Sequence, residues 1–95
     1  MIAYDAVGQE VFIGDIVACT TGGGRYSASI HVGRVERIFQ GTGNDKKLVK
    51  ISVTLPRKYS YRNNGDIVWE KKPFHAQGKC VKLEGFDLDA YVANL

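Results

Sequence analysis

Six consecutive residues ending at Arg62 hold the clearest combination of side chains for recognising another molecule. Their sequence, Arg-Lys-Tyr-Ser-Tyr-Arg, places two aromatic rings between cations. Cations neutralise phosphates and rings stack on bases, so the segment favours contact with nucleic acid. In an extended strand, Arg57, Tyr59 and Tyr61 would share one face, and Lys58, Ser60 and Arg62 would share the other. The alternative is a sheet edge on which the tyrosines are half-buried and the cations only maintain solubility.

A glycine-rich stretch is the second candidate. Gly22 to Gly24 precede Arg25 and Tyr26. Backbone N–H groups of such a run could cradle a phosphate, with Arg25 closing over it. However, the Gly-x-x-x-x-Gly-Lys-Ser/Thr order of a P-loop is absent, and no helix pattern follows. We therefore favour a flexible hairpin tip that presents the Arg25–Tyr26 pair over a nucleotide site.

The charges are segregated along the chain. All thirteen Lys and Arg fall between Arg25 and Lys82, against four Asp and Glu there, so this segment carries a net charge of +9. The residues before it and after it carry −3 each. Such a split favours a basic surface that attracts polyanions. The cations that could extend this surface, depending on strand register, are Arg34, Arg37, Lys71, Lys72 and Lys79.

Cysteines and histidines are too scattered to predict a reactive centre. Cys19 and Cys80 lie far apart in the sequence, and a reducing compartment disfavours a stable bridge, so both thiols are expected to pack as small hydrophobes. With His31 and His75 they could form a zinc site on paper, but the spacing that pre-places zinc ligands is absent. No motif ties either histidine to a nucleophile. We expect no metal, no cofactor and no catalysis.

Length and composition predict one domain over residues 1–95, because two cores in a chain of this size would each be too small. No apolar run approaches the roughly 18 residues needed to cross a bilayer. The first residues, Met-Ile-Ala-Tyr-Asp, lack the layout of a signal peptide. These features predict a cytoplasmic location and no association with membranes.

The elements that would position the candidate residues are mostly strands. A long hairpin is expected over residues 14–39, with Val17 inside and a β-bulge at Gly33 or Arg34. Residues 48–55 alternate with period two and predict a central strand that Pro56 ends. Further short strands are expected at residues 2–4 or 10–12, at 67–70 and at 79–83. Lys71-Lys72-Pro73 is expected to end the second of these, and residues 74–78 to connect it to the last. Val11 and Ile13 are expected in the core.

Residues 86–94 predict a short helix. Asp87 is its expected N-cap, and Leu88, Tyr91, Val92 and Leu95 share one face by their spacing. A face of this kind would serve as a lid for the open end of a small β-barrel.

The residues between the first turn and the central strand carry a family resemblance. They read Val11-x-Ile13-Gly14-Asp15-x-Val17, then Val32-Gly33-x-Val35-x-x-Ile38, then Val49-x-Ile51-x-Val53. Over about residues 8–55 this pattern resembles SH3-like barrels of the KOW kind, and small proteins of tailed bacteriophages. The resemblance implies a five-stranded SH3-like β-barrel with a short C-terminal helix. It also implies nucleic acid, or the transcription and translation machinery, as partners, and it transfers no catalytic residue.

The leading hypothesis from the sequence is a non-catalytic, phage-type module that binds nucleic acid or is associated with transcription. A competing hypothesis is a phage-encoded inhibitor or adaptor that docks on a host enzyme or defence component. A third is a homo-oligomer that sequesters a signalling nucleotide in a pocket lined by Arg25 or Tyr26. The residues predicted to bind nucleic acid are Arg57, Lys58, Tyr59, Tyr61, Arg62, Arg25, Tyr26 and Arg34.

Overall fold

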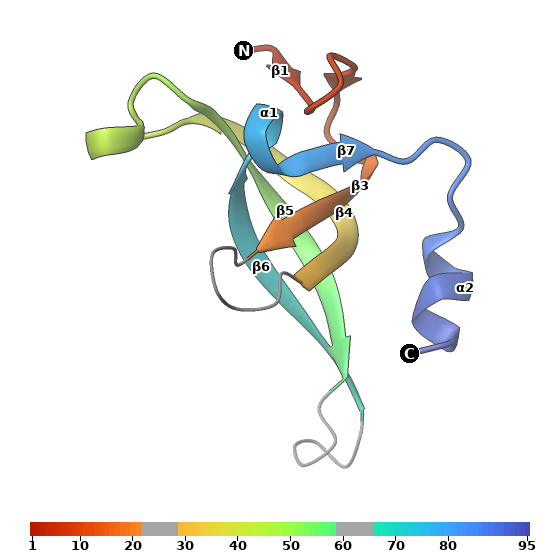
Figure 1. Ribbon diagram of the computed structural model, residues 1–95. Helices are drawn as coiled ribbons and strands as arrows, with labels where there is room; N and C mark the ends of the chain where they lie inside the picture. Colours follow the sequence, from red (N-terminus) through yellow and green to blue (C-terminus); the bar gives the residue numbers. More distant parts are fainter. Residues whose placement is uncertain (22–28, 59–65) are drawn as a thin grey trace.

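The protein is mainly β (Figure 1), as seen in a computed structural model that describes residues 1–21, 29–58 and 66–95. The predictions for Arg25, Tyr26 and residues 59–62 lie outside these ranges. Among the described residues, two antiparallel sheets are present, one of two strands and one of five. The elements are β1 (Ala3–Tyr4), β2 (Glu10–Val11), β3 (Ile16–Thr21), β4 (Ser29–Gln40), η1 (Gly43–Asp45), β5 (Val49–Lys58), β6 (Ile67–His75), α1 (Ala76–Lys79), β7 (Cys80–Lys82) and α2 (Leu88–Ala93).

The larger sheet has the strand order β6-β5-β4-β3-β7, with every neighbouring pair antiparallel. Within the described ranges β6 and β7 are its two edges, so the sheet is open and the predicted closed barrel is not formed. The predicted central strand is confirmed, because β5 has a strand on each side. None of the described helices is long and apolar enough to span a membrane.

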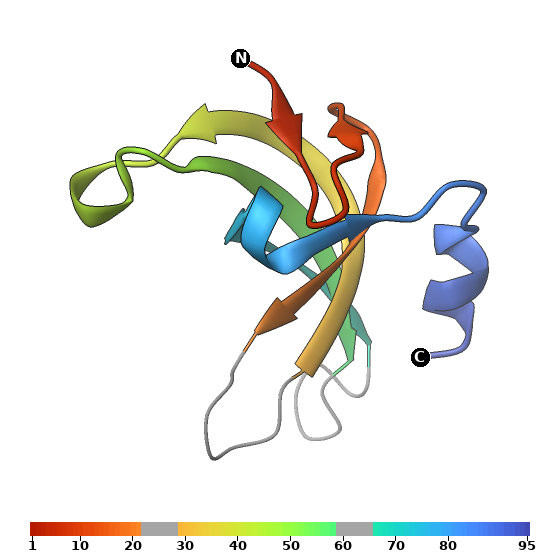
Figure 2. The same cartoon turned by 45° about the horizontal axis from the view of Figure 1, so that its top comes forward.

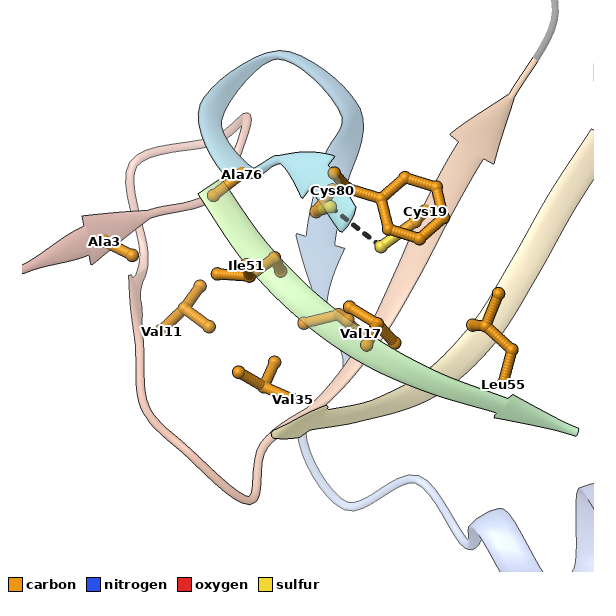
Figure 3. Close-up of a cluster of buried hydrophobic side chains, with 11 residues drawn as sticks. Ala3, Val11, Val17, Cys19, Val35, Ile51, Leu55, Ala76 and Cys80 are labelled. Carbon is orange, nitrogen blue, oxygen red and sulfur yellow. Dashed lines mark hydrogen bonds between the residues drawn. The ribbon is translucent and has the colours of Figure 1, made fainter. Parts of the chain in front are cut away.

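One face of the sheet carries the core. Ile51, Val53 and Leu55 alternate along β5 and are buried, as their period-two pattern predicted. Val17, Cys19 and other side chains from β3, β4, β6, β7, α1 and the small sheet complete the cluster (Figure 3). We call this side of the strands the inner face and the opposite side the outer face.

β4 bends between its two neighbours. Its first half pairs with β3 and its second half with β5, and the pairing to β5 extends only from Gln40 back to Arg34. The bulge lies between Val35 and Arg37, slightly beyond the predicted position. Gly33 is required at the crossing, because a Cβ there would lie 2.3 Å from the backbone oxygen of Thr54. The β3–β4 and β5–β6 hairpins therefore diverge, yet both extend toward the same end of the molecule (Figure 2).

Both prolines lie inside strands, contrary to the prediction. β5 continues through Pro56 to Lys58, and β6 continues through Pro73 to His75, which also places Phe74 in a strand and in the core. β6 is an edge strand, and β5 has lost β4 as a neighbour before it reaches Pro56. Proline is tolerated at such edges because a missing N–H need not break a ladder there.

A buried carboxylate attaches the N-terminal strands to the sheet. Asp5 is fully buried; its Oδ2 accepts from the backbone N–H of Lys82 at 2.8 Å, and its Oδ1 accepts from those of Val7 and Gln9. The backbone N–H of Ala6 donates to the carbonyl of Cys80 at 2.8 Å. These bonds hold the β1–β2 hairpin over the core, where it contributes the buried side chains of Ala3 and Val11.

Two other details of the sequence prediction have clear outcomes. Both short strands, β1 and β2, exist and pair with each other. Val11 is buried as predicted, whereas Ile13 is 66% exposed, so its place in the core was predicted wrongly. Ile13 falls in the turn before Gly14, which has a φ of +97°, and strand alternation does not apply there.

The C-terminal helix α2 forms where it was predicted, and the Asp87 side chain accepts from the N–H of Ala90 as an N-cap. Leu88 is buried, but it is not part of the core cluster. The outer-face residue Lys58 donates from Nζ to the backbone oxygen of Leu95 at 3.2 Å. α2 therefore ends beside the outer face of the sheet (Figure 1), and no barrel end is present among the described strands for it to cover.

Candidate nucleic-acid interface

Strands β4, β5 and β6 present a continuous outer face rich in cations. Register places Arg34, Thr54 and Lys71 in one row across the three strands. The next rows are Arg37–Ser52–Pro73 and Phe39–Lys50–His75. Side chains paired across strands point to the same side, and their neighbours Ile51 and Val53 are in the core. The outer cations of these strands, with Lys58 near the end of β5, are Arg34, Arg37, Lys50, Lys58 and Lys71.

Aromatic rings lie among these cations. Trp69 is 50% exposed and is paired across the strands with Pro56. Phe39 carries the guanidinium of Arg37 over its ring, 4.8 Å from the centroid. A half-exposed tryptophan on the face of a sheet offers a stacking surface, and a ring beside cations is an arrangement found in proteins that bind single-stranded nucleic acids.

The inner face at the diverging ends of the hairpins is polar and holds charges of both signs. Arg57 pairs with Glu70 across the strands at 3.5 Å. His31 donates to or accepts from the hydroxyl of Thr21 at 3.0 Å. Burial first, then the cations of Arg57 and Lys72, lower the pKa of His31, against a smaller opposing effect of Glu70. The charges of Arg57, Lys72 and Glu70 on the β5–β6 hairpin therefore act on His31 of β4.

Only some of the predicted residues come together on one face. Among those that the structure describes, Arg34 and Lys58 lie on the outer face, and both are exposed. Arg57 lies on the inner face with Glu70, as the alternation of side chains predicted for neighbours in a strand. Arg25, Tyr26, Tyr59, Tyr61 and Arg62 are outside the described residues.

Sequence reasoning missed Phe39, Lys50 and Trp69 as parts of this surface. Each lies at an outer register position, and each was hidden because a single strand pattern does not say which residues of neighbouring strands stand side by side. Arg37 and Lys71 were predicted as possible extensions, and register places both in the surface. Lys72 belongs to the inner face, and Lys79 lies in α1.

The two cysteines meet in the core. Register pairs Cys19 with Cys80 on one side and with His31 on the other, and the two Sγ atoms are 2.7 Å apart. The hydrogen bond between the thiols, together with burial, raises the pKa of Cys19 far above its ordinary value. In the described ranges, no three His, Cys, Asp or Glu side chains are arranged as metal ligands would be.

A small cavity of about 100 Å³ lies where the N-terminal strand meets the start of β5 and the end of β6. Ile2, Tyr4, Lys47, His75 and Gln77 are among its lining residues. Gly78 leaves room for the His75 ring, because a Cβ there would come within 2.5 Å of the imidazole Nδ1. The cavity is at the end of the strands opposite to the polar inner-face residues.

Comparison with known proteins gives a family. No curated protein and no solved structure matches the chain. A family model described as a domain of unknown function, DUF7205, matches residues 3–83. The match includes both sheets and ends before α2. The chain belongs to the DUF7205 family.

Proposed function

We propose that the protein is a non-catalytic nucleic-acid-binding module whose ligand lies along the outer face of β4, β5 and β6. The observation that carries the proposal is the outer face of these strands, where register places five cations on the same side as Phe39 and Trp69. The outer register positions of the three strands hold no acidic side chain among the described residues, and Glu36 of β4 falls in the bulge between Val35 and Arg37. The charged side chains at these register positions are therefore all cationic.

The chemistry of this surface favours single-stranded nucleic acid. Lysine and arginine neutralise phosphates without reading sequence, and exposed rings stack on any base. A row of outer positions spans three strands, about 10 Å by strand spacing, which is enough for a few nucleotides. We propose weak discrimination between sequences and binding that weakens as salt rises.

The same proposal includes the predicted residues beyond the described ranges. β5 leads from Lys58 into residues 59–65, and β3 leads from Thr21 into residues 22–28. The proposal assigns Arg62, which alternation groups with Lys58, to an extension of the outer face, and it assigns Tyr59, Tyr61, Arg25 and Tyr26 to ligand contacts beyond the ends of the two hairpins. Its support is that both hairpins extend toward the same end of the molecule (Figure 2).

Fluorescence anisotropy with labelled single-stranded RNA and DNA of about a dozen nucleotides tests the proposal over a salt series. We expect binding at low salt and a logarithmic dependence of affinity on salt with a slope near −0.7 for each phosphate contacted. Absence of binding at about 50 mM salt or below, or an affinity independent of salt, contradicts the proposal.

Two adjacent lysines provide a matched control for the face. Lys71 and Lys72 are both exposed and follow each other on β6, but Lys71 is on the outer face and Lys72 on the inner face. Lys71→Gln and Lys72→Gln remove the same charge from nearly the same place. We expect Lys71→Gln to reduce the affinity for the oligonucleotide and to make that affinity less dependent on salt. Lys72→Gln should change the affinity and its salt dependence less. Equal losses would show a diffuse attraction to net charge.

A second candidate function is that of an inhibitor or adaptor that binds another protein. It is favoured by apolar side chains on and around the N-terminal hairpin, where Val7 is 67% exposed, Phe12 53% and Ile13 66%. Capture from a nuclease-treated host lysate separates the two functions. A stoichiometric partner that is retained after nuclease treatment, and lost on Phe12→Ser, favours this second function.

We further propose that the fold is an open relative of the SH3-like barrels of the KOW kind, within a phage-type protein acting in the host cytoplasm. The support is the bent β4, which pairs with β3 over its first half and with β5 over its second. Transcription or translation complexes then become candidate sources of the nucleic acid. A nuclear Overhauser contact between backbone groups of β6 and β7 in solution would contradict the open sheet.

A further inference from the structure

The pair Cys19 and Cys80 joins two strands that are far apart in the sequence. The residues are separated by 61 positions, yet they are directly paired between β3 and the edge strand β7. Both side chains are fully buried, and Sγ faces Sγ (Figure 3). The contact belongs to the core and lies away from the outer face, so the chemistry of the two thiols is independent of the proposed function.

The backbone geometry at this pair suits a covalent link. The N–H of Leu83 donates to the carbonyl of its opposite residue, Ile16, which makes that a hydrogen-bonded pair of the antiparallel ladder. Pairs alternate along a ladder, so Cys19–Cys80, three rungs on, is a non-hydrogen-bonded pair. Opposite Cα atoms in such a pair are about 4.5 Å apart, within the range that disulfides span.

The outward backbone groups of β7 agree with this assignment. The carbonyl of Cys80 accepts from Ala6, and the N–H of Lys82 donates to Asp5. Both groups therefore point away from β3, as non-hydrogen-bonded positions require. The same bonds attach the N-terminal hairpin to β7.

We propose that Cys19 and Cys80 form an intramolecular disulfide when the protein meets a disulfide oxidant such as oxidised glutathione. One cysteine thiolate attacks a glutathione sulfur and expels one glutathione thiolate; the second cysteine thiolate then attacks the mixed disulfide and expels the other. Two protein thiols are oxidised, one glutathione disulfide is reduced to two thiols, and the protons that the protein thiols lose are taken up by the glutathione thiolates through solvent. The bond ties the edge strand β7, and through it the N-terminal hairpin, to β3.

The reaction needs β7 to open. Because the attacking species is the thiolate, a thiol buried against another thiol reacts slowly while the sheet is intact. β7 has only three residues paired with β3, so local opening at this edge is the expected route. Oxidation should accelerate in sub-denaturing urea and should be complete when reduced protein is refolded in the presence of the oxidant.

Intact-mass spectrometry of the full chain after refolding with oxidised glutathione is the test. We expect a loss of about 2 Da, a linked peptide containing Cys19 and Cys80, and no retained glutathione. The thermal midpoint should rise by about 10 °C, because the closed loop is long, and dithiothreitol should reverse it. Cleavage by chymotrypsin after the exposed Phe12 should slow in the oxidised form.

The test does not depend on whether the variants fold, because the disulfide is detected by mass in the unaltered chain. The variants Cys19→Ser and Cys80→Ser should each retain a glutathione adduct, and their thermal midpoints should not rise on oxidation. A stable mixed disulfide on the unaltered chain, or a Cys19–Cys80 bridge that lowers the thermal midpoint, overturns the proposal.

Discussion

The two faces of β5 share one backbone but carry opposite kinds of side chain, which are apolar and buried on the inner face and mostly polar or cationic on the outer face. On the inner face, Ile51, Val53 and Leu55 are buried, and the charged residue that follows them, Arg57, is paired with Glu70. On the outer face, Lys50 and Lys58 lie on the same side of the sheet as Arg34 and Arg37 of β4 and Lys71 of β6. The inner face is arranged for stability, whereas the outer face keeps like charges close together. Like charges held close together disfavour folding, and a polyanionic ligand of the kind proposed above would neutralise them.

The largest effect should follow from opening a cavity on the inner face. Ile51→Ala removes a fully buried side chain at the centre of the core, and we expect the free energy of unfolding to fall by about 3 kcal/mol in urea titrations. Ser52→Ala, at the adjacent outer position, should change it by less than about 0.5 kcal/mol. A comparable loss from both substitutions would contradict the division between the faces.

The next effect concerns the attachment of the N-terminal hairpin. Asp5→Asn removes the negative charge of a carboxylate that accepts four hydrogen bonds, three of them from backbone N–H groups. We expect a loss of about 2 kcal/mol at neutral pH, since hydrogen bonds to charged groups are the stronger kind. Equilibrium unfolding by urea at neutral pH measures it, with Glu10→Gln on the exposed side of β2 as the control.

Acid should remove the same contribution in the unaltered protein. Burial alone would raise the pKa of Asp5, but the hydrogen bonds from Lys82, Gln9 and Val7 outweigh it, so the pKa lies below its ordinary value of 3.8. The folded state therefore binds this proton less readily than the unfolded state. The stabilisation that the ionised Asp5 carboxylate gives to the folded state is complete above about pH 3.8 and declines as the pH falls through the pKa of the folded state. Asp5→Asn should show a shallower loss of stability in this range; an unchanged slope would contradict the assignment.

Binding should depend on the exposed ring of the outer face. Trp69→Ala should weaken binding to single-stranded oligonucleotides roughly tenfold, because one stacked base contributes about 1–3 kcal/mol. Trp69→Phe keeps an aromatic surface and should recover much of that affinity. Circular dichroism and the unfolding midpoint verify that both variants keep the fold. An unchanged affinity for Trp69→Ala would remove the ring from the interface.

How far the sequence predicted these two faces depends on the element. Alternation in residues 48–55 predicted the inner side of β5 correctly, because one buried face imposes period two on a strand. It failed at Pro56 and Pro73, since a strand at an edge tolerates proline and edge status comes from pairing. The prediction of a closed barrel was wrong for the same reason, because the edges of a sheet depend on which strands pair, and those strands are far apart in the sequence.

The candidate surface was predictable only in part. Arg34, Arg37 and Lys71 were identified by charge, and Lys58 by its place in a basic and aromatic segment. Trp69 and Phe39 were not, because their neighbours on the surface come from other strands. The meeting of Cys19 with Cys80 depends on β7 pairing with β3, which no local pattern of residues indicates.

The smallest effect tests the assignment of Arg57, which the sequence included among the binding residues and which register places on the inner face. Arg57 and Glu70 are both more than a third exposed, and solvent screening limits such a pair to about 0.5 kcal/mol. Replacing both, Arg57→Gln with Glu70→Gln, leaves the net charge unchanged. We expect oligonucleotide affinity within about twofold of the unaltered protein, because the phosphates follow the outer cations. Arg34→Gln should lower affinity by more than the double substitution does. If the double substitution has the larger effect, the ligand lies between the hairpins, beside His31 and Lys72, and the outer face loses its assignment.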